Sequence, residues 1–280
     1  MQKSEEENFK DKTLSLYNVF MNFNFQNLDD LKNKWKNALP FNHIIIDNFL
    51  PNDIAVRVAE EFPDFNSDFW YEYENPLEIK KACSDWNKFP STIYKVFLSL
   101  LSSQVSDVLS YITDITLYPD YGLHGGGLHT HKSGGKLNTH LDYSIHPKAS
   151  LQRKVNIILY VTENWDPLWN GSLGLWSHDN KTNQPLDLVQ DIECKFNRAV
   201  IFDTTMNSWH GLPNPVKCPL DKSRNSLATY YLCEPSNEVD TRAKALYAPS
   251  EDQKNNEFIA DLIKKRANIN QFDKVYRVKD

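Results

Sequence analysis

The sequence lacks the marks of several common protein classes. Its four cysteines, Cys83, Cys194, Cys218 and Cys233, have neither the spacing of a metal site nor the density of a disulfide framework. No stretch approaches the ~20 apolar residues that a membrane span needs. The polar segment Met1–Glu7 does not resemble a signal peptide. We therefore expect a reducing, cytoplasmic location and no membrane segment.

A dense basic cluster is also missing. With a net charge of −6, the chain is not expected to bind nucleic acid, which requires a Lys/Arg footprint. Its 280 residues, 40% hydrophobic and 12% aromatic, are enough to bury a sizeable core. No linker or repeat divides them, so we expect one domain over residues 1–280. Within it we expect a mainly helical support region at 1–114, a β core at 115–235 and a helical extension at 236–280.

Short strand patterns fill the expected β core. Segments rich in β-branched and aromatic residues, bounded by Gly, Pro and Asn turns, predict strands. They cover residues 136–145, 154–162, 172–176, 196–202 and 226–232, with one more strand beginning at His210. No long helix separates them. The pattern predicts an α+β, mainly β fold whose core is a double-stranded β-helix, that is, a cupin-like antiparallel jelly roll.

Helical periodicity flanks this core on both sides. Apolar residues at helical spacing predict helices over Leu28–Leu39 and Ala55–Phe62, and a longer helix from about Ser91 to Tyr111. We expect these helices to back the sheet. Ser250–Gln253 resembles a capping box before a final amphipathic helix. The aromatic and acidic segment Phe69–Glu78 breaks the pattern, and we expect a loop there that either faces the substrate or simply packs on the surface.

A possible metal site stands out within the strands. His140 and Asp142 are two residues apart, so both side chains point to the same face of an extended strand. His210, from a distant strand, completes a set of two histidines and one carboxylate, which suits non-haem Fe(II) with open positions on the metal. Such a set also occurs by chance: a lone histidine is more often a structural residue, and an aspartate can cap a turn. The strands around the set decide between these alternatives.

Those flanking strands resemble the Fe(II)/2-oxoglutarate-dependent oxygenases, specifically their prolyl 4-hydroxylase-like branch. The matched segments follow the order found in that branch. They are His140-Leu-Asp142, Ile158-Leu-Tyr-Val-Thr-Glu-Asn-Trp165 with Gly171-Ser-Leu-Gly-Leu175, Lys195-Phe-Asn-Arg-Ala-Val-Ile-Phe202, Trp209-His-Gly-Leu-Pro-Asn-Pro-Val216 and Arg224-Asn-Ser-Leu-Ala-Thr-Tyr-Tyr231. Phe41–Pro51 also resembles the first strand of the branch.

The resemblance implies roles for particular residues. His140, Asp142 and His210 would bind Fe(II), and 2-oxoglutarate and O2 would occupy the remaining positions on the metal. Arg224 would pair with the far carboxylate of 2-oxoglutarate, since a guanidinium stays charged and matches two oxygens. Tyr160 would contact the same carboxylate, although a core aromatic is an equal alternative. Ascorbate is a possible reductant.

The chain departs from the branch in two places. The segment Val216–Ser223 looks like an inserted loop between His210 and Arg224, and it carries two rival cations, Lys217 and Lys222. Arg224 is preferred to both because it directly precedes a strand and has the matching neighbours. The second departure is His131, which stands near the place of a tyrosine that the branch has before its HxD motif.

His131 belongs to a glycine- and histidine-rich segment, residues 121–135. His129 and His131 could bind a second metal, but zinc sites usually need three or four ligands, and no CxxC or HExxH motif accompanies them. We expect these histidines to face the substrate mouth. The glycines make the segment a candidate lid, because they permit the backbone changes that closure needs.

Three functional classes remain open. The resemblance favours an oxygenase that hydroxylates a C–H bond, with prolyl or other peptidyl hydroxylation slightly preferred to a small-molecule substrate such as an amino acid or sugar. A metal-dependent hydrolase or isomerase on a similar barrel is the second class, and it would not need Arg224. The third class is a metal-binding module without catalysis. Neither the substrate nor the oligomeric state follows from the sequence.

Overall fold

The structure is a computed structural model that describes residues 23–267, apart from residues 206, 238, 240, 241 and 243. The predicted regions 1–114 and 236–280 therefore extend beyond the described residues, as does the segment Met1–Glu7. The division of the chain into these regions stays a prediction.

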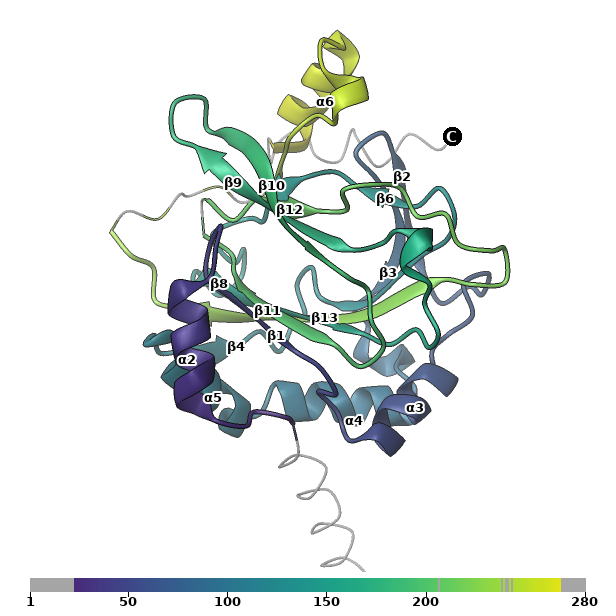
Figure 1. Cartoon of the computed structure of the whole chain (residues 1–280), viewed down its shortest axis with the longest axis vertical. Coiled ribbons are helices and arrows are strands. Elements are labelled where there is room, and N and C mark those ends of the chain that lie inside the picture. The colour runs from purple at the N-terminus through teal and green to yellow at the C-terminus, as the bar shows by residue number, and fades with distance from the viewer. Residues whose placement is uncertain (1–22, 206, 238, 240–241, 243, 268–280) are drawn as a thin grey trace, which may run out of the picture.

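Two antiparallel sheets form the centre of the molecule (Figure 1). Their strands are β1 (His43–Ile46), β2 (Tyr71–Asn75), β3 (Glu78–Cys83), β4 (Tyr118–Pro119), β5 (Gly127–His131), β6 (Lys136–Leu137), β7 (His140–Leu141), β8 (Gln152–Tyr160), β9 (Leu173–Asp179), β10 (Gln184–Ile192), β11 (Ala199–Asp203), β12 (His210–Gly211), β13 (Arg224–Cys233) and β14 (Leu246–Tyr247). The larger sheet has the order β1-β11-β8-β13-β5-β3-β2, with β4 on β13 and β6 on β3. The smaller sheet has the order β10-β9-β12-β7-β14. This arrangement confirms the predicted α+β fold with a jelly-roll core.

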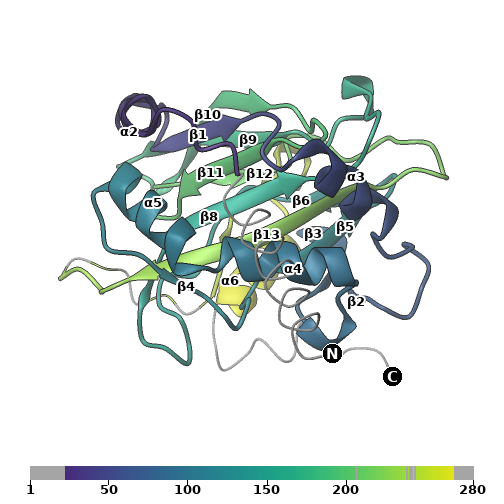
Figure 2. The same ribbon diagram turned by 90° about the horizontal axis from the view of Figure 1, so that it is seen from below.

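Four helices cover one face of the larger sheet, on the side away from the smaller sheet (Figures 1 and 2). They are α2 (Leu28–Asn37), α3 (Asn52–Glu60), α4 (Ser91–Leu100) and α5 (Ser103–Thr113). Their apolar stripes pack with the sheet in a single core that includes Trp35, Val58 and Leu109. Each fully buried aliphatic side chain in such a core contributes about 1.5–3 kcal/mol. The helices predicted over 28–39 and 55–62 are confirmed.

The single long helix predicted over 91–111 is wrong. The chain forms α4 and α5 with a bend of 46° between them. Ser102 causes the break, because its backbone is extended and its hydroxyl accepts a hydrogen bond from the backbone N–H of Val105, which begins a new helix. No single helix among the described residues is long and apolar enough to cross a membrane; α4 and α5 pass that test only together, by length and composition.

The C-terminal prediction is confirmed within the described residues. Ser250 and Gln253 form the expected capping box at a 3-10 turn, and α6 (Glu257–Ala267) follows. In Figure 1 this helix lies at the opposite end of the molecule from α2–α5. It packs beside β14, and Ile259 is buried with Leu77 and Tyr247.

Three local predictions need correction. The segment Phe69–Glu78 is not a loop, because most of it forms the β2–β3 hairpin. The predicted strand 136–145 is broken into β6 and β7, and β10 has no counterpart in the prediction. Residues 127–131 of the glycine and histidine segment do not form a lid, since they are β5, which is paired on one side with β13 and on the other with β3. Its glycines allow close packing: a Cβ on Gly127 would lie 2.1 Å from the Cys83 carbonyl oxygen.

Candidate metal centre and co-substrate pocket

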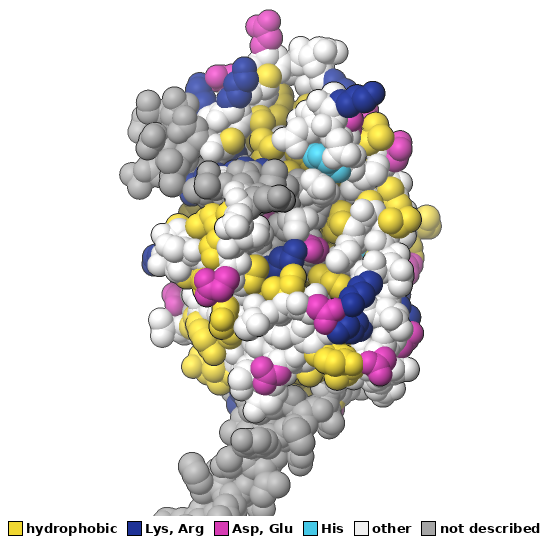
Figure 3. All heavy atoms as spheres, turned by 90° about the vertical axis from the view of Figure 1, so that its left-hand side faces the viewer, with side chains coloured by type: hydrophobic (Ala, Val, Ile, Leu, Met, Phe, Trp, Pro, Cys, Tyr) yellow, Lys and Arg dark blue, Asp and Glu magenta, His cyan; other side chains and the backbone are white. Residues whose placement is uncertain are grey.

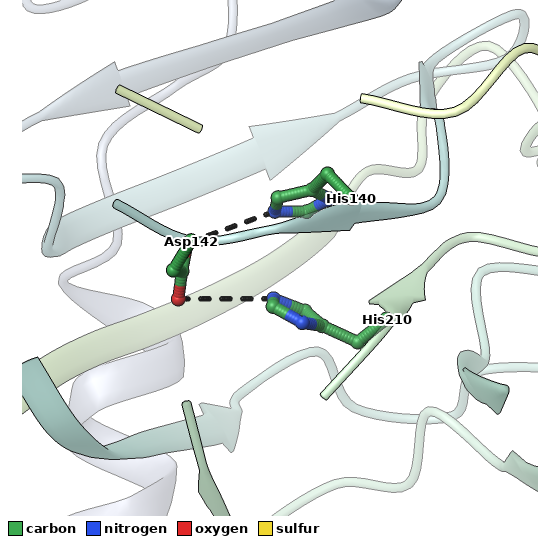
Figure 4. A group of neighbouring side chains, drawn as sticks. All are labelled: His140, Asp142 and His210. Carbon is green, nitrogen blue, oxygen red and sulfur yellow. Dashed lines mark ion pairs between the residues drawn. The ribbon is translucent and has the colours of Figure 1, made fainter. Parts of the chain in front are cut away.

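The two histidines of the predicted triad meet across the smaller sheet. His140 in β7 and His210 in β12 are register partners, and their ring centroids are 4.3 Å apart. Asp142 follows β7, and its carboxylate lies to one side of the two imidazoles and faces both (Figure 4). All three residues are buried. The structure therefore brings together side chains that are distant in the sequence.

The spacing of the three side chains suits a shared ion. One candidate ligand atom from each residue lies within 4.8 Å of the others. The carboxylate oxygens of Asp142 are 3.8 Å from Nε2 of His140 and 3.9 Å from Nε2 of His210, too far for hydrogen bonds. Oδ2 of Asp142 is buried without a hydrogen-bond partner among the described residues. A buried, unpartnered carboxylate oxygen is costly, and a bound cation would compensate for that cost.

Backbone carbonyls fix the orientation of both imidazoles. Nδ1 of His140 lies 2.9 Å from the carbonyl oxygen of Asn138, and Nδ1 of His210 lies 2.8 Å from that of Ser208. A carbonyl can only accept, so each Nδ1 carries the proton and donates it. Each Nε2 then presents a lone pair toward Asp142, as a metal ligand requires.

The charge state also favours metal binding. Burial, assisted by the neighbouring His210, lowers the pKa of His140 to about 3, so this imidazole is neutral at pH 7. Burial alone would raise the pKa of Asp142, but the charges of Arg153 and the neighbouring groups outweigh it and lower the pKa. A carboxylate and neutral imidazoles are the donors that Fe(II) accepts. The three residues fit a divalent iron ion.

A cavity of about 680 Å³ is lined by the triad and by Arg224. Arg224 begins β13, and its Nε donates to the carbonyl oxygen of Gly171 while its Nη2 donates to the hydroxyl of Tyr160 at 3.3 Å. Burial raises the pKa of Tyr160 to about 12, so this hydroxyl keeps a proton to donate to a ligand. The rival cations Lys217 and Lys222 do not line the cavity.

Residues 126–232 match the family model described as the 2OG-Fe(II) oxygenase superfamily. The match spans the triad, Tyr160 and Arg224. This part of the chain is a 2OG-Fe(II) oxygenase domain. No curated protein matches the sequence of this oxygenase.

Solved structures share the fold of the oxygenase at low sequence identity. A prolyl-4-hydroxylase from Pseudomonas putida is 16% identical, covers 73% of this chain and 99% of its own, and has a TM-score of 0.50. A prolyl hydroxylase from Trichoplax adhaerens, in complex with a peptide fragment of the hypoxia inducible factor oxygen degradation domain, is 19% identical, covers 75% and 92%, and also scores 0.50. The epimerase SnoN from nogalamycin biosynthesis, which is non-haem and α-ketoglutarate dependent, is 11% identical, covers 79% and 85%, and scores 0.51. At these identities the likeness shows the fold alone.

The oxygenase places its other two candidate histidines inside the same cavity. His129 and His131 are two residues apart on β5, so both face the cavity. Their register partners on β13 are Ser226 and Arg224. His131 is 2% exposed, and neither of its ring nitrogens has a hydrogen-bond partner among the described residues. Burial, with the charges of Arg224 and Lys80, lowers its pKa well below the usual value. His131 therefore lies as a neutral group beside the arginine.

Sequence reasoning missed a second arginine in this oxygenase. Arg153 is 2% exposed, and its guanidinium lies 3.4 Å from the ring centroids of both Tyr143 and Tyr230. Its Nη1 is 3.5 Å from Asp142 Oδ1. Simple alternation along β8 would turn Arg153 toward the helices, in line with Val155. A register shift between Val155 and Arg153 instead turns it to the cavity, as a β-bulge does near many functional sites.

Proposed function

We propose that this oxygenase hydroxylates a C–H bond of its substrate while it converts 2-oxoglutarate to succinate and CO2. One observation supports this most directly: the triad and a buried arginine open into the same cavity. A metal-ligand set alone would equally suit a hydrolase. A fixed guanidinium in the same cavity instead matches the far carboxylate of 2-oxoglutarate.

Separate groups of residues would bind the metal and the co-substrate. His140, Asp142 and His210 would hold Fe(II), while Arg224 and the Tyr160 hydroxyl would bind and orient the far carboxylate of 2-oxoglutarate. When bound, the iron and 2-oxoglutarate together supply the oxidising chemistry. Burial of the triad limits the access of water to the site. Ascorbate, as a reductant that keeps the iron ferrous, is part of this proposal.

For the substrate, a prolyl or other peptidyl side chain is slightly favoured. The similar structures from Pseudomonas putida and Trichoplax adhaerens are prolyl hydroxylases, and the latter holds a peptide. A small molecule is the alternative, because SnoN shares the fold equally well and is named for an epimerase reaction in the biosynthesis of nogalamycin. A fold does not decide between these substrates.

The proposal can be tested before the substrate is known. Anaerobic protein with Fe(II) and 2-oxoglutarate should develop the weak visible absorption of a chelated 2-oxo acid, and oxygen should then yield succinate. His140→Ala should abolish both signals. His43→Ala is a matched control: His43 is also buried and also has Nδ1 2.9 Å from a carbonyl oxygen two residues earlier, but it lies outside the cavity. Signals that survive in His140→Ala, or that never appear in the unaltered protein, contradict the proposal.

The competing hydrolase or isomerase function predicts a different response at Arg224. Such an enzyme needs the metal but has no use for a carboxylate anchor. Arg224→Ala would then leave metal affinity and turnover nearly intact. For the oxygenase we expect unchanged metal affinity and a loss of 2-oxoglutarate affinity, measured by calorimetry on Mn(II)-loaded protein.

A further inference from the structure

The cavity is cationic although the protein is acidic. Nine charged residues line it, six positive against three negative: Lys80, Lys88, Arg153, Arg224, Lys244 and Arg266 against Glu78, Asp85 and Asp142. The whole chain carries a net charge of −6. On the face shown in Figure 3, positive and negative side chains are interspersed. The excess of positive charge is therefore a local property of the cavity.

The metal and the co-substrate do not remove this excess. Fe(II) and the 2-oxoglutarate dianion cancel each other, with Asp142 used by the metal and Arg224 by the co-substrate. The lining histidines His124 and His129 add no charge, since burial and the neighbouring cations lower the pKa of the former to about 4 and of the latter to about 3. The excess of three positive charges remains after both are bound.

Lys80 carries part of this excess close to the reacting centre. It lies on the cavity face of β3, and the β3–β5 register places it beside His131, one strand from Arg224. Lys80 also lines the cavity that holds the triad. It is thus the cavity lysine on the strand next to β5.

A single carboxylate serves two of the cations. Oε2 of Glu78 is 3.2 Å from Nζ of Lys80, and Oε1 of Glu78 is 2.9 Å from Nη2 of Arg266, which comes from α6. Glu78 is only 1% exposed. This buried carboxylate is therefore shared between Lys80 and Arg266.

Arg153 carries another part of the excess, next to Asp142 of the triad. The rings of Tyr143 and Tyr230 hold its guanidinium next to Asp142. The carboxylate that it approaches is also the proposed metal ligand. Nη2 of Arg153 donates to the carbonyl oxygen of His124, whereas its Nε has no hydrogen-bond partner among the described residues. Once Asp142 is shared with a metal ion, Arg153 therefore has positive charge and a donor available for a ligand.

We propose that the substrate of this oxygenase carries a carboxylate or phosphate group, which binds in the cavity between Lys80 and Arg153. The inference rests on the proposed function, because it concerns the anion that binds in addition to 2-oxoglutarate. Charge complementarity of this kind selects acidic molecules and rejects their neutral counterparts. Whether the substrate is a peptide or a small molecule, it would therefore have to carry an anionic group.

Small probes can test this without the true substrate. The protein is loaded with Mn(II) and saturating 2-oxoglutarate, and paramagnetic line broadening is measured for acetate, for acetamide and, by 31P resonance, for inorganic phosphate. We expect acetate to be broadened about tenfold more than acetamide, the ratio that one charge-assisted contact supplies. A phosphate signal that is broadened more than the acetate signal assigns the site to phosphate esters, and the reverse assigns it to carboxylates.

Variants then locate the anion. Lys80→Met should remove the preference for acetate over acetamide, Arg153→Met should reduce it, and Lys80→Arg should retain it. Lys81→Met is the matched control, because Lys81 is the next residue of β3, is as buried as Lys80, and does not line the cavity. It should behave as the unaltered protein does.

The outcomes separate the two proposals. Equal broadening of acetate and acetamide in the unaltered protein overturns the anionic substrate class, whether or not any variant folds. A Lys80→Met protein that loses affinity for 2-oxoglutarate but keeps the acetate preference also overturns it, since Lys80 would then serve the co-substrate. Failure of the unaltered protein to bind 2-oxoglutarate in calorimetry contradicts the proposed function itself.

Discussion

The two faces of the larger sheet have opposite chemistry, although the same strands form both. On the helix-covered face, β8 contributes Val155, Ile157 and Leu159 to the apolar core. On the cavity face, neighbouring residues of the same strand, Asn156 and Ile158, line the pocket with the triad. Because side chains alternate along a strand, one segment can supply stability on one side and binding groups on the other. Substitutions on the two faces should therefore have separable effects.

The largest expected effect is on the helix-covered face. Leu159→Ala removes a fully buried side chain and should lower the free energy of unfolding by about 2–5 kcal/mol, measured by urea denaturation. Affinity for 2-oxoglutarate, measured on the folded protein, should hardly change. Ile158→Ala, one residue away and partly buried, should cost less stability. Equal loss of 2-oxoglutarate affinity in both variants would contradict the separation of the two faces.

Next in size is a steric effect behind the co-substrate arginine. Gly171 has φ +84°, and a Cβ there would lie 2.9 Å from Cδ of Arg224. Gly171→Ala should displace Arg224 and weaken 2-oxoglutarate binding about tenfold, the equivalent of ~1.4 kcal/mol. Gly134→Ala is the control, because Gly134 has φ +85° but nothing within 4 Å of its Cβ position. Gly134→Ala should lower stability without weakening 2-oxoglutarate binding. If both variants lost 2-oxoglutarate affinity to a similar extent, the cause would be backbone strain and not the displacement of Arg224.

A smaller effect is expected at the Tyr160 hydroxyl. Tyr160→Phe keeps the buried ring but removes the hydroxyl that accepts from Arg224 and, in the proposed function, would donate to 2-oxoglutarate. Because water can take the place of the lost hydroxyl, 2-oxoglutarate binding should weaken by only about 1 kcal/mol, the net value of a typical hydrogen bond. Calorimetry on Mn(II)-loaded protein measures the change. An unchanged Kd would leave Tyr160 as a core aromatic, the alternative that the sequence also allows.

The smallest effect lies at the edge of the sheet, outside both faces. Hydrogen bonds from Arg198, with a further contribution from Lys195, lower the pKa of Asp47 to about 2. A lowered pKa in the folded protein means that the stabilisation is present above about pH 4 and is lost as the pH falls toward 2. Asp47→Asn should flatten this part of the pH profile of the urea midpoint. The change should be small because Asp47 is partly exposed, and a profile identical to that of the unaltered protein would show that the pair contributes nothing.

Much of the metal centre could be predicted from sequence because its determinants are local. His140 and Asp142 need only an extended chain to share one side, and the strand before His210 has a clear apolar pattern. The resemblance implies the role of Arg224, which is preferred to Lys217 and Lys222 because it has the matching neighbours and directly precedes a strand. Each of these predictions rests on neighbouring residues in the chain, where side-chain periodicity is reliable.

The remaining residues of the cavity depend on contacts between distant strands. Lys80 cannot be assigned to the cavity from the sequence, because nothing near it indicates that β3 pairs with β5. Arg153 faces the cavity only because of a register shift, which the pattern of residues along β8 does not predict. The break at Ser102 is of a third kind, since a serine inside an apolar periodic segment can either continue a helix or cap a new one. Packing decides between the two.

The bulge in β8 has a consequence for robustness. Lys154 occupies the extra position and pairs with Asp203 at 2.7 Å, whereas Arg153 faces the cavity. If β8 alternated regularly without the bulge, Lys154 would point into the cavity and Arg153 would point toward the helices. Either register therefore presents a positive charge at this point, but only the bulged one presents a planar fork of donors. The charge of the cavity tolerates a slip of the strand, whereas its hydrogen-bonding pattern does not.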